Sequence, residues 1–185
     1  MAKAKADLDA NGGLKQVIFV ACGGSFASSY PARYLLNQES SLRVQGYNSS
    51  EFVHATPKSV DQNTLVIGTS TKATPETVQA LQVAKDKGAV TIGLSGYADS
   101  LTARYYVTYY HADEWYQDPS LVHCNSQGTA LKIAFWLLKE YDHYAYFDQA
   151  MEAFEKMRDI YGAAYAAVKP QTAKFAMTYK DDQVW

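Results

Sequence analysis

Two short segments combine small, hydroxyl-bearing and cationic residues in a pattern that suits an anion such as phosphate. Cys22-Gly23-Gly24-Ser25 is the first, and Thr69-Ser70-Thr71-Lys72-Ala73-Thr74 is the second. Serine and threonine hydroxyls can donate to phosphate oxygens, a lysine adds positive charge, and glycines let the backbone approach the anion. We therefore expect one phosphate site, with ligand contacts made by Gly23, Gly24, Ser25, Thr69, Ser70, Thr71, Lys72 and Thr74.

The second segment also has a plainer explanation. Thr74, Pro75 and Glu76 are typical of a helix start, with a capping hydroxyl, a proline at the first position and an acid in the first turn. Serine and threonine are also common in loops. Binding is favoured because both segments lead from an apolar run directly into a predicted helix, whose first N–H groups are unpaired and suit an anion.

Five short runs predict strands. Gln16–Ala21 and Thr64–Thr69 are mainly apolar runs, which is typical of strands buried on both faces of a parallel sheet, and residues 89–94 predict a fourth strand. Residues 42–47 alternate and predict a strand nearer the sheet edge, and residues 106–110 predict the fifth strand. The two hydroxyl-rich segments therefore follow the first and third strands.

Helical periodicity and capping residues predict the remaining elements. The first helix carries Phe26, Tyr30, Tyr34 and Leu35 on one apolar stripe, with Pro31 in its early turns. Further helices are predicted at residues 74–87, 99–104, 126–141 and 146–168 and from residue 171 onward, with Pro170 ending the fourth of these.

Alternating strands and helices with short connections predict an α/β fold. We expect a three-layer sandwich around a five-stranded parallel sheet of order 2-1-3-4-5, similar to a flavodoxin-like sheet. Ligands in such sheets bind beyond the carboxyl ends of the strands, where the strand order reverses, and here that point lies between the first and third strands. Residues 1–142 are expected to form the binding domain and residues 143–185 a helical segment that follows it.

Composition and charge exclude several classes of protein. An apolar share of 48% with 19% charged residues is unlike a disordered chain, and a formal net charge of -2 gives no basic field for duplex nucleic acid. No run of about 18 apolar residues predicts a membrane span. Two widely separated cysteines, Cys22 and Cys124, form neither a disulfide framework nor a zinc motif, so a reducing cytoplasm is expected.

Nucleotide cofactors are not expected. No Gly-Lys-Ser/Thr triplet is present for a P-loop, and Gly23-Gly24 lacks the third glycine of a dinucleotide fingerprint. The end of the second strand, Tyr47-Asn48-Ser49-Ser50, offers no acid for a ribose before Glu51. A nucleotide-binding flavodoxin-like domain is therefore a weak alternative.

The residues at these turns resemble the sugar isomerase (SIS) domain family over roughly residues 17–110. The resemblance rests on Val20-Ala21-Cys22-Gly23-Gly24-Ser25, on Thr69 to Val78, on Lys87 to Leu94 and on Asp99-Ser100. Tyr30-Pro31-Ala32-Arg33-Tyr34, with Glu39-Ser40, is most similar to the amino-terminal half of fructoselysine-6-phosphate deglycases and their relatives, the isomerase halves of glucosamine-6-phosphate synthases.

The resemblance implies a phosphosugar site. By position, the phosphate would be held by Ser25, Thr69, Ser70 through its backbone, Thr71 and Thr74. Two family serines are threonines here, which keeps the hydroxyls, but Lys72 stands where the family has glycine. Because a loop glycine often has a positive φ that is costly for lysine, we expect either a rebuilt loop or a changed phosphate affinity.

Full-length family members carry two SIS domains, and their catalytic glutamate and histidine lie in the second, in a Glu-x-x-His-Gly segment. No such segment occurs here, and Asp182-Gln183-Val184-Trp185 resembles the first strand of that second half. The resemblance thus implies the phosphosugar-binding half of a cytoplasmic isomerase or deglycase, acting as a homodimer or beside a second SIS domain. The alternative is a non-catalytic phosphosugar sensor.

Other polar residues are weaker candidates for the functional site. Glu114 follows the fifth strand and could act in proton transfer, although a solvated loop acid beside Asp113 is the simpler interpretation. His111 and His123 flank the same loop without metal-ligand spacing, so no metal site is expected. Cys22 is interpreted as a small packed residue and His54 as a surface residue of a short helix.

Overall fold

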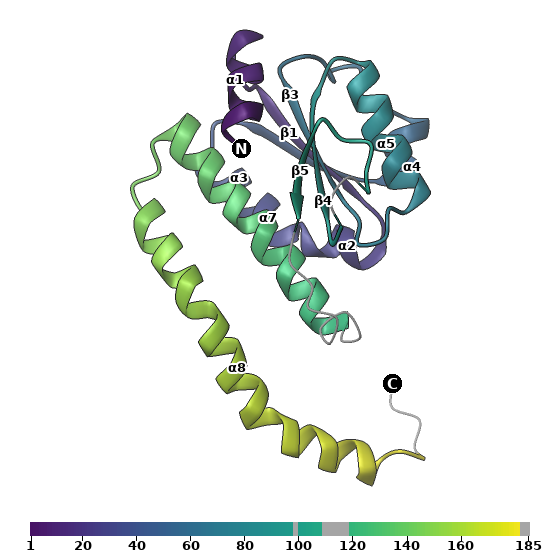
Figure 1. Cartoon of the computed structure of the whole chain (residues 1–185), viewed down its shortest axis with the longest axis vertical. Coiled ribbons are helices and arrows are strands. Elements are labelled where there is room, and N and C mark those ends of the chain that lie inside the picture. The colour runs from purple at the N-terminus through teal and green to yellow at the C-terminus, as the bar shows by residue number, and fades with distance from the viewer. Residues whose placement is uncertain (98–99, 109–118, 182–185) are drawn as a thin grey trace. The chain divides into compact units, whose positions relative to one another are not determined.

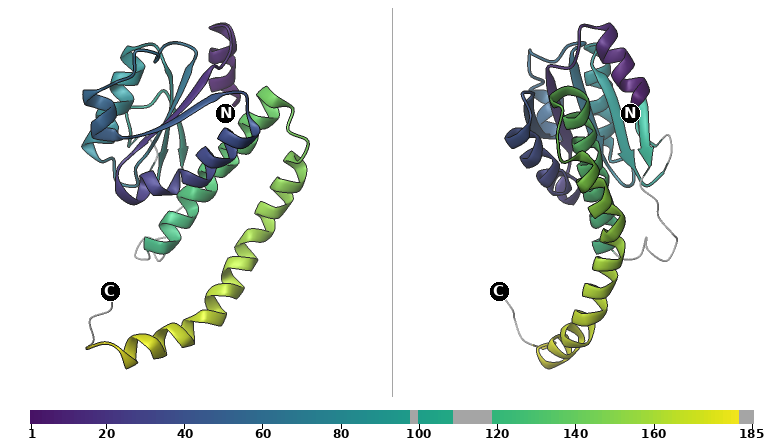
Figure 2. Two further views of the ribbon diagram at one scale, coloured as in Figure 1. Left: turned by 180° about the vertical axis from the view of Figure 1, so that it is seen from behind. Right: turned by 90° about the vertical axis from the view of Figure 1, so that its left-hand side faces the viewer.

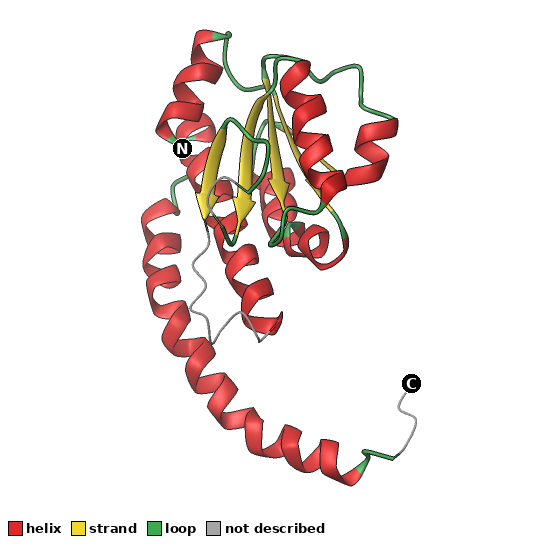
Figure 3. Cartoon of the chain, turned by 45° about the vertical axis from the view of Figure 1, so that its right-hand side comes forward, coloured by secondary structure: helices red, strands yellow, loops and turns green. Residues whose placement is uncertain are grey.

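The computed structural model describes residues 1–97, 100–108 and 119–181. Five parallel strands form one sheet in the order β2-β1-β3-β4-β5, and their arrowheads point the same way in Figure 3. The strands are β1 (Gln16–Ala21), β2 (Arg43–Asn48), β3 (Thr64–Thr69), β4 (Val90–Ser95) and β5 (Tyr105–Thr108). The α/β class, the strand order and the edge position of the second strand are confirmed.

Helices cover both faces of the sheet (Figure 1). α1 (Ala2–Ala10), α3 (Tyr30–Glu39) and α7 (Pro119–Asp142) contribute to one core cluster, and α4 (Ser49–His54) and α5 (Pro75–Asp86) contribute to the other. The short α2 (Gly23–Ser28) connects β1 to α3. Figure 2 shows the same three layers from behind and from the side.

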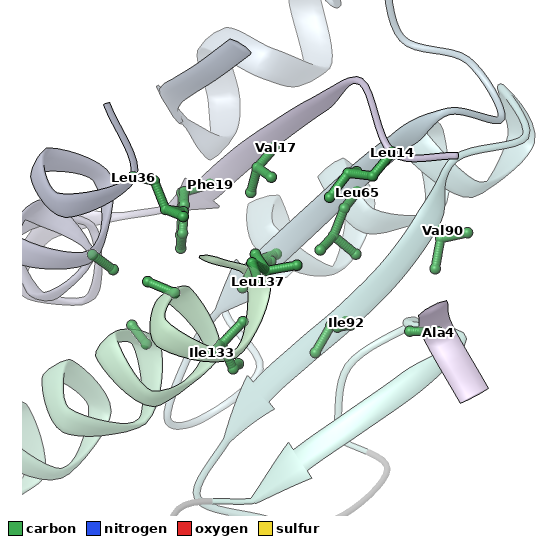
Figure 4. Packing of buried hydrophobic residues seen from close by; sticks show 14 of the residues in the cluster. Ala4, Leu14, Val17, Phe19, Leu36, Leu65, Val90, Ile92, Ile133 and Leu137 are labelled. Atoms are coloured by element: carbon green, nitrogen blue, oxygen red, sulfur yellow. The ribbon is translucent and has the colours of Figure 1, made fainter. Parts of the chain in front are cut away.

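The larger core cluster is built from alternating strand residues and one stripe of each helix. Phe19 of β1, Leu65 of β3 and Ile92 of β4 are at most 1% exposed and lie beneath Leu36 of α3 and Leu137 of α7 (Figure 4). Alternate strand residues point to the opposite face, where Ile18, Val20 and Val66 pack with α4 and α5. This burial fixes the strand register and therefore the position of the loops at the strand ends.

β3 and α5 approach each other closely at a glycine. A Cβ placed on Gly68 would lie 2.6–2.8 Å from three atoms of the Leu81 side chain, so only glycine fits there without a shift. Leu81 is fully buried in the second core cluster. The Gly68–Leu81 contact therefore holds α5, and with it the loop that precedes α5, against the sheet.

The single helix predicted after Ser25 is wrong in detail. α2 and α3 are two helices, because Pro31 lies at the first positions of a new one rather than inside the old one. Tyr30 and Tyr34 are 62% and 58% exposed, while Ala32 and Leu36 are fully buried. The aromatic stripe is therefore a surface feature, and the small and branched residues form the packed face.

Three other helix predictions also need correction. Residues 100–104 are not helical; Leu101 and Ala103 instead pack against Gly93 of β4. α7 begins at Pro119 rather than at Ser126. α8 (Phe147–Thr178) is one helix that includes Pro170. The proline removes one backbone N–H donor but does not end the helix. The predicted strand at residues 183–185 lies outside the described residues.

The chain folds as two compact units, Met1–Ala145 and Tyr146–Trp185. The second unit contains α8, on which Ile160, Tyr165 and Phe175 are more than half exposed. Among the helices of the described residues, none combines the length and apolar character that a bilayer crossing needs.

Candidate functional site

The sheet places the two hydroxyl-rich segments side by side. Ala21 and Thr69, the last residues of β1 and β3, are paired across the two central strands. Neighbouring strands lie about 4.8 Å apart, so Cys22 and Ser70 leave the same edge of the sheet next to each other. The strand order reverses at this point, as the sequence predicts.

Ser70 shapes the second segment from within. It is 2% exposed, and its N–H donates to the carbonyl of Leu94 at 3.0 Å. Its Oγ accepts the N–H of Thr74 at 2.8 Å and lies 2.9 Å from the Thr74 Oγ1. Because the Ser70 amide is already paired within the sheet, a bound anion would rely on the other groups of this loop.

Thr74 occupies the predicted N-cap position of α5, but its side chain makes no capping hydrogen bond. The hydroxyl contacts Ser70 instead. Thr71 and Thr74 are partly exposed and Lys72 is exposed, whereas Thr69 is 3% exposed and belongs to the sheet. The loop therefore offers two accessible hydroxyls and one cation at the start of a 12-residue helix.

The residue with a left-handed backbone conformation in this loop is not the lysine that replaces the family glycine. Ala73, not Lys72, has a positive φ, of 54°. The left-handed conformation costs a non-glycine residue about 1–2 kcal/mol. The strain in this loop therefore falls on Ala73, one residue after the lysine.

Replacing Ala73 with glycine should relieve this strain. We expect Ala73→Gly to raise the free energy of unfolding by up to about 1 kcal/mol, because the relieved strain exceeds the extra entropy of the unfolded chain. Urea unfolding measures the change. Lys72→Gly is the matched control and should not stabilise the chain; the reverse ranking of the two variants would contradict this backbone assignment.

The first segment opens with a left-handed glycine. Gly23 has a φ of 53° and begins α2, which places the N–H groups of Gly24 and Ser25 in the first helical turn. Ser28, on the next turn, is buried and donates to the carbonyl of Gly24 at 2.9 Å. Ser25 itself is partly exposed.

A pocket of about 270 Å³ lies beside this turn, lined by Gly24, Ala27, Ser28, His123 and Gln127. The His123 ring packs on Gly24 so closely that a Cβ there would lie 2.4 Å from Cε1 and 2.8 Å from Nε2. The His123 Nδ1 lies 3.4 Å from the Ser28 Oγ. α7 therefore supplies one wall of the site through His123 and Gln127, which are four residues apart.

The pocket contains side chains that the sequence did not point to. The sequence motifs do not indicate Ser28 or Gln127, and they place His123 only at the flank of a loop, ahead of a helix predicted to begin at Ser126. The signal was the i, i+4 spacing of His123 and Gln127, which becomes meaningful only when Pro119 is taken as a helix start.

The remaining candidates have separate outcomes. Glu114 and His111 lie outside the described residues. Glu51 and His54 are exposed on α4 and are followed by Ala55. Cys22 and Cys124 are free and partly buried. In the described ranges, no three histidine, cysteine or acidic side chains gather as metal ligands would.

Comparison with known proteins agrees with this geometry. The SIS domain family matches residues 14–137. The chain is 31% identical to the fructosamine deglycase FrlB of Bacillus subtilis over 175 residues, which are 92% of this chain and 52% of that protein. It is 35% identical over 81 residues to a glutamine–fructose-6-phosphate aminotransferase of Aquifex aeolicus, covering 43% of this chain and 14% of that protein.

A solved structure agrees over nearly the whole chain. A candidate phosphosugar isomerase from Salmonella typhimurium superimposes with a TM-score of 0.82 at 35% identity, covering 97% of this chain and 56% of that one. The chain thus spans about half the length of FrlB and of this structure. The resemblance seen in the turn motifs is confirmed, and the chain belongs to the SIS domain family.

Proposed function

We propose that this chain is the phosphosugar-binding half of a sugar-phosphate isomerase or deglycase. The observation that carries the proposal is the convergence of the Cys22–Ser25 turn and the Ser70–Thr74 loop at the reversal point of the sheet. Ser25, Thr71 and Thr74 would donate to the phosphate oxygens, and Lys72 would add positive charge. Gly23 and Gly24 would admit the anion close to the backbone, while Thr69 and Ser70 would position the loop.

The reaction expected of such a site moves a proton between C1 and C2 of a sugar phosphate. The anchored phosphate fixes the distance between the reacting carbon and the base. Phosphate binding therefore orients the substrate for proton transfer. Glu114 is a candidate for a proton-transfer role from this chain. The main acid–base groups would come from a second SIS domain or from a second copy of this chain.

The second unit fits the role of a linker to that partner. α8 presents Ile160, Tyr165 and Phe175, all more than half exposed, along one long helix. Apolar and aromatic side chains of this kind are typical of surfaces that are covered in an assembly. We propose that residues 143–185 join or contact the second SIS domain and that the assembly works in the cytoplasm without a cofactor.

A non-catalytic phosphosugar sensor is the second candidate. It is favoured by the fact that the hydroxyl-bearing residues proposed to hold the phosphate, Ser25, Thr71 and Thr74, could bind a phosphosugar without any acid–base group. The same anchor would then report the level of a phosphosugar rather than position it for reaction. Mixing the chain with a second SIS half and assaying isomerisation separates the two candidates.

A thermal-shift screen of the whole chain tests binding. Ligand at 100 times its dissociation constant stabilises a protein by about 2.7 kcal/mol, which for a chain of this size raises the melting temperature by about 5–10 °C. We expect this response to fructose 6-phosphate or glucosamine 6-phosphate and none to FMN or NAD. Indifference to every phosphosugar, or a response to FMN, would contradict the proposal.

A further inference from the structure

His123 is an exposed residue of α7 whose ring makes two contacts with α2. Its ring lies so close to Gly24 that no side chain fits between them, and its Nδ1 faces the Ser28 hydroxyl at 3.4 Å. Ser28 is only 6% exposed, so this hydroxyl cannot turn freely to water. The backbone carbonyl of His123 is also bound, by the Ser126 hydroxyl at 3.0 Å.

The direction of these hydrogen bonds sets the tautomer of the imidazole. The Ser28 hydroxyl donates its only proton to the Gly24 carbonyl at 2.9 Å. If its oxygen accepts from the His123 Nδ1 at 3.4 Å, the ring proton lies on Nδ1, and this is the tautomer that the proposal uses. In the neutral ring Nε2 is left as an acceptor, and this atom lies over Gly24 at the pocket wall.

An acceptor at this position discriminates between the two ends of a phosphosugar. The phosphate monoester dianion of a sugar phosphate has only acceptor oxygens and gains nothing from the Nε2 lone pair, whereas a sugar hydroxyl or ammonium group can donate to it. The side-chain amide of Gln127, one helical turn further along α7, can donate and accept in the same pocket. The pocket therefore suits the polyol part of a ligand whose phosphate lies at the Ser70–Thr74 loop.

We propose that His123 is a specificity-determining residue that accepts a hydrogen bond from a hydroxyl or ammonium group on the sugar portion of the substrate, with Ser28 fixing its tautomer. The proposal rests on the proposed function, since it concerns the same site. It extends that site from the loops after β1 and β3 to the first two turns of α7. It assigns discrimination of the sugar to α7 and recognition of the phosphate to the loops.

Titration calorimetry on the whole chain with two probes tests the assignment. We expect His123→Ala to raise the dissociation constant of fructose 6-phosphate about 3- to 10-fold, the loss of one hydrogen bond, and to leave that of inorganic phosphate unchanged. His143→Asn, at an exposed histidine just after the end of α7, is the matched control and should leave both constants unchanged. Equal weakening of both probes by His123→Ala, or weakening of neither, would overturn the proposal.

A second variant separates tautomer control from packing. Ser28→Ala should also weaken fructose 6-phosphate and spare inorganic phosphate, and it should have little further effect when His123 is already alanine. Additive losses would overturn the role given to Ser28 and His123 as a unit. Melting temperatures without ligand show that each variant is folded before its binding is measured.

The two proposals fail in different ways. A wild-type chain that binds neither fructose 6-phosphate nor inorganic phosphate would overturn the proposed function, and this inference with it. A wild-type chain that binds fructose 6-phosphate only as tightly as the His123→Ala chain does would overturn this inference alone.

Discussion

A chain in which Leu81 is replaced with alanine should lose about 2–5 kcal/mol of its free energy of unfolding. Leu81 lies on the face of α5 that packs on the sheet and is fully buried, with its side chain against Gly68 of β3. Removing a buried leucine side chain sacrifices its transfer free energy and leaves a cavity that packed neighbours fill only in part. For a chain of this size the melting temperature should fall by about 2–4 °C for each kcal/mol.

Two further variants show whether the contact between Leu81 and Gly68 causes this loss of stability. Gln79→Ala, on the exposed face of the same helix, should change stability by no more than about 0.5 kcal/mol. Gly68→Ala should destabilise the wild-type chain through overpacking, yet should be tolerated when Leu81 is alanine, because the new methyl group fills the cavity. A loss below about 1 kcal/mol for Leu81→Ala would contradict the packing described between β3 and α5.

The double substitution Thr71→Val with Thr74→Val should abolish thermal stabilisation by fructose 6-phosphate. Valine preserves the branched shape but removes both accessible hydroxyls of the loop, so the phosphate loses two donors. It also removes one of the two hydrogen bonds of the buried Ser70 hydroxyl, the contact of 2.9 Å with the Thr74 Oγ1, while the N–H of residue 74 still donates to the Ser70 Oγ. The loss of that one hydrogen bond should cost the loop about 0.5–1.5 kcal/mol.

The matched control is the double substitution Thr71→Ser with Thr74→Ser, which keeps both hydroxyls. That chain should retain most of the ligand-induced rise in melting temperature. A valine chain that still responds fully to fructose 6-phosphate would show that the phosphate is bound elsewhere. The melting temperature without ligand is recorded for both chains, so that a loss of response is separated from a loss of folding.

The strands were the most predictable part of the fold. β1 and β3 coincide with the predicted runs Gln16–Ala21 and Thr64–Thr69, whose interiors are apolar apart from a glycine, as is typical of strands buried on both faces of a parallel sheet. The strand order followed from the short connections, and the neighbouring position of the two loops followed from that order. The order of the strands therefore predicts that the two hydroxyl-rich loops are neighbours.

The interior of the site was less predictable. Whether the strain of the loop falls on Lys72 or Ala73 depends on which amides the sheet has already paired, and the pairing of Ser70 with Leu94 is a tertiary contact. The contact of His123 with Gly24 joins residues about one hundred positions apart. It depends on α7 beginning at Pro119, in a stretch whose His, Cys, Asn and Ser residues have modest helix propensity.

The helical errors share a cause. Pro31 and Pro170 both disfavour a helix interior, yet Pro31 lies near the start of α3 and Pro170 lies inside α8. Local sequence gives the cost of a proline, about 3 kcal/mol in a helix interior, but not the packing or chain context that outweighs it. Tyr30 and Tyr34 have helical spacing but lie on the exposed face of α3. The face that packs on the sheet carries Ala32 and Leu36, which are fully buried.

A crystal structure of the chain with fructose 6-phosphate bound tests the central claim most directly. The account predicts the phosphate group between the two turns, with its oxygens about 2.7–3.0 Å from the hydroxyls of Ser25 and Thr71. Phosphate density at any other place on the chain, or Ser25 and Thr71 side chains that point apart with nothing between them, would contradict it.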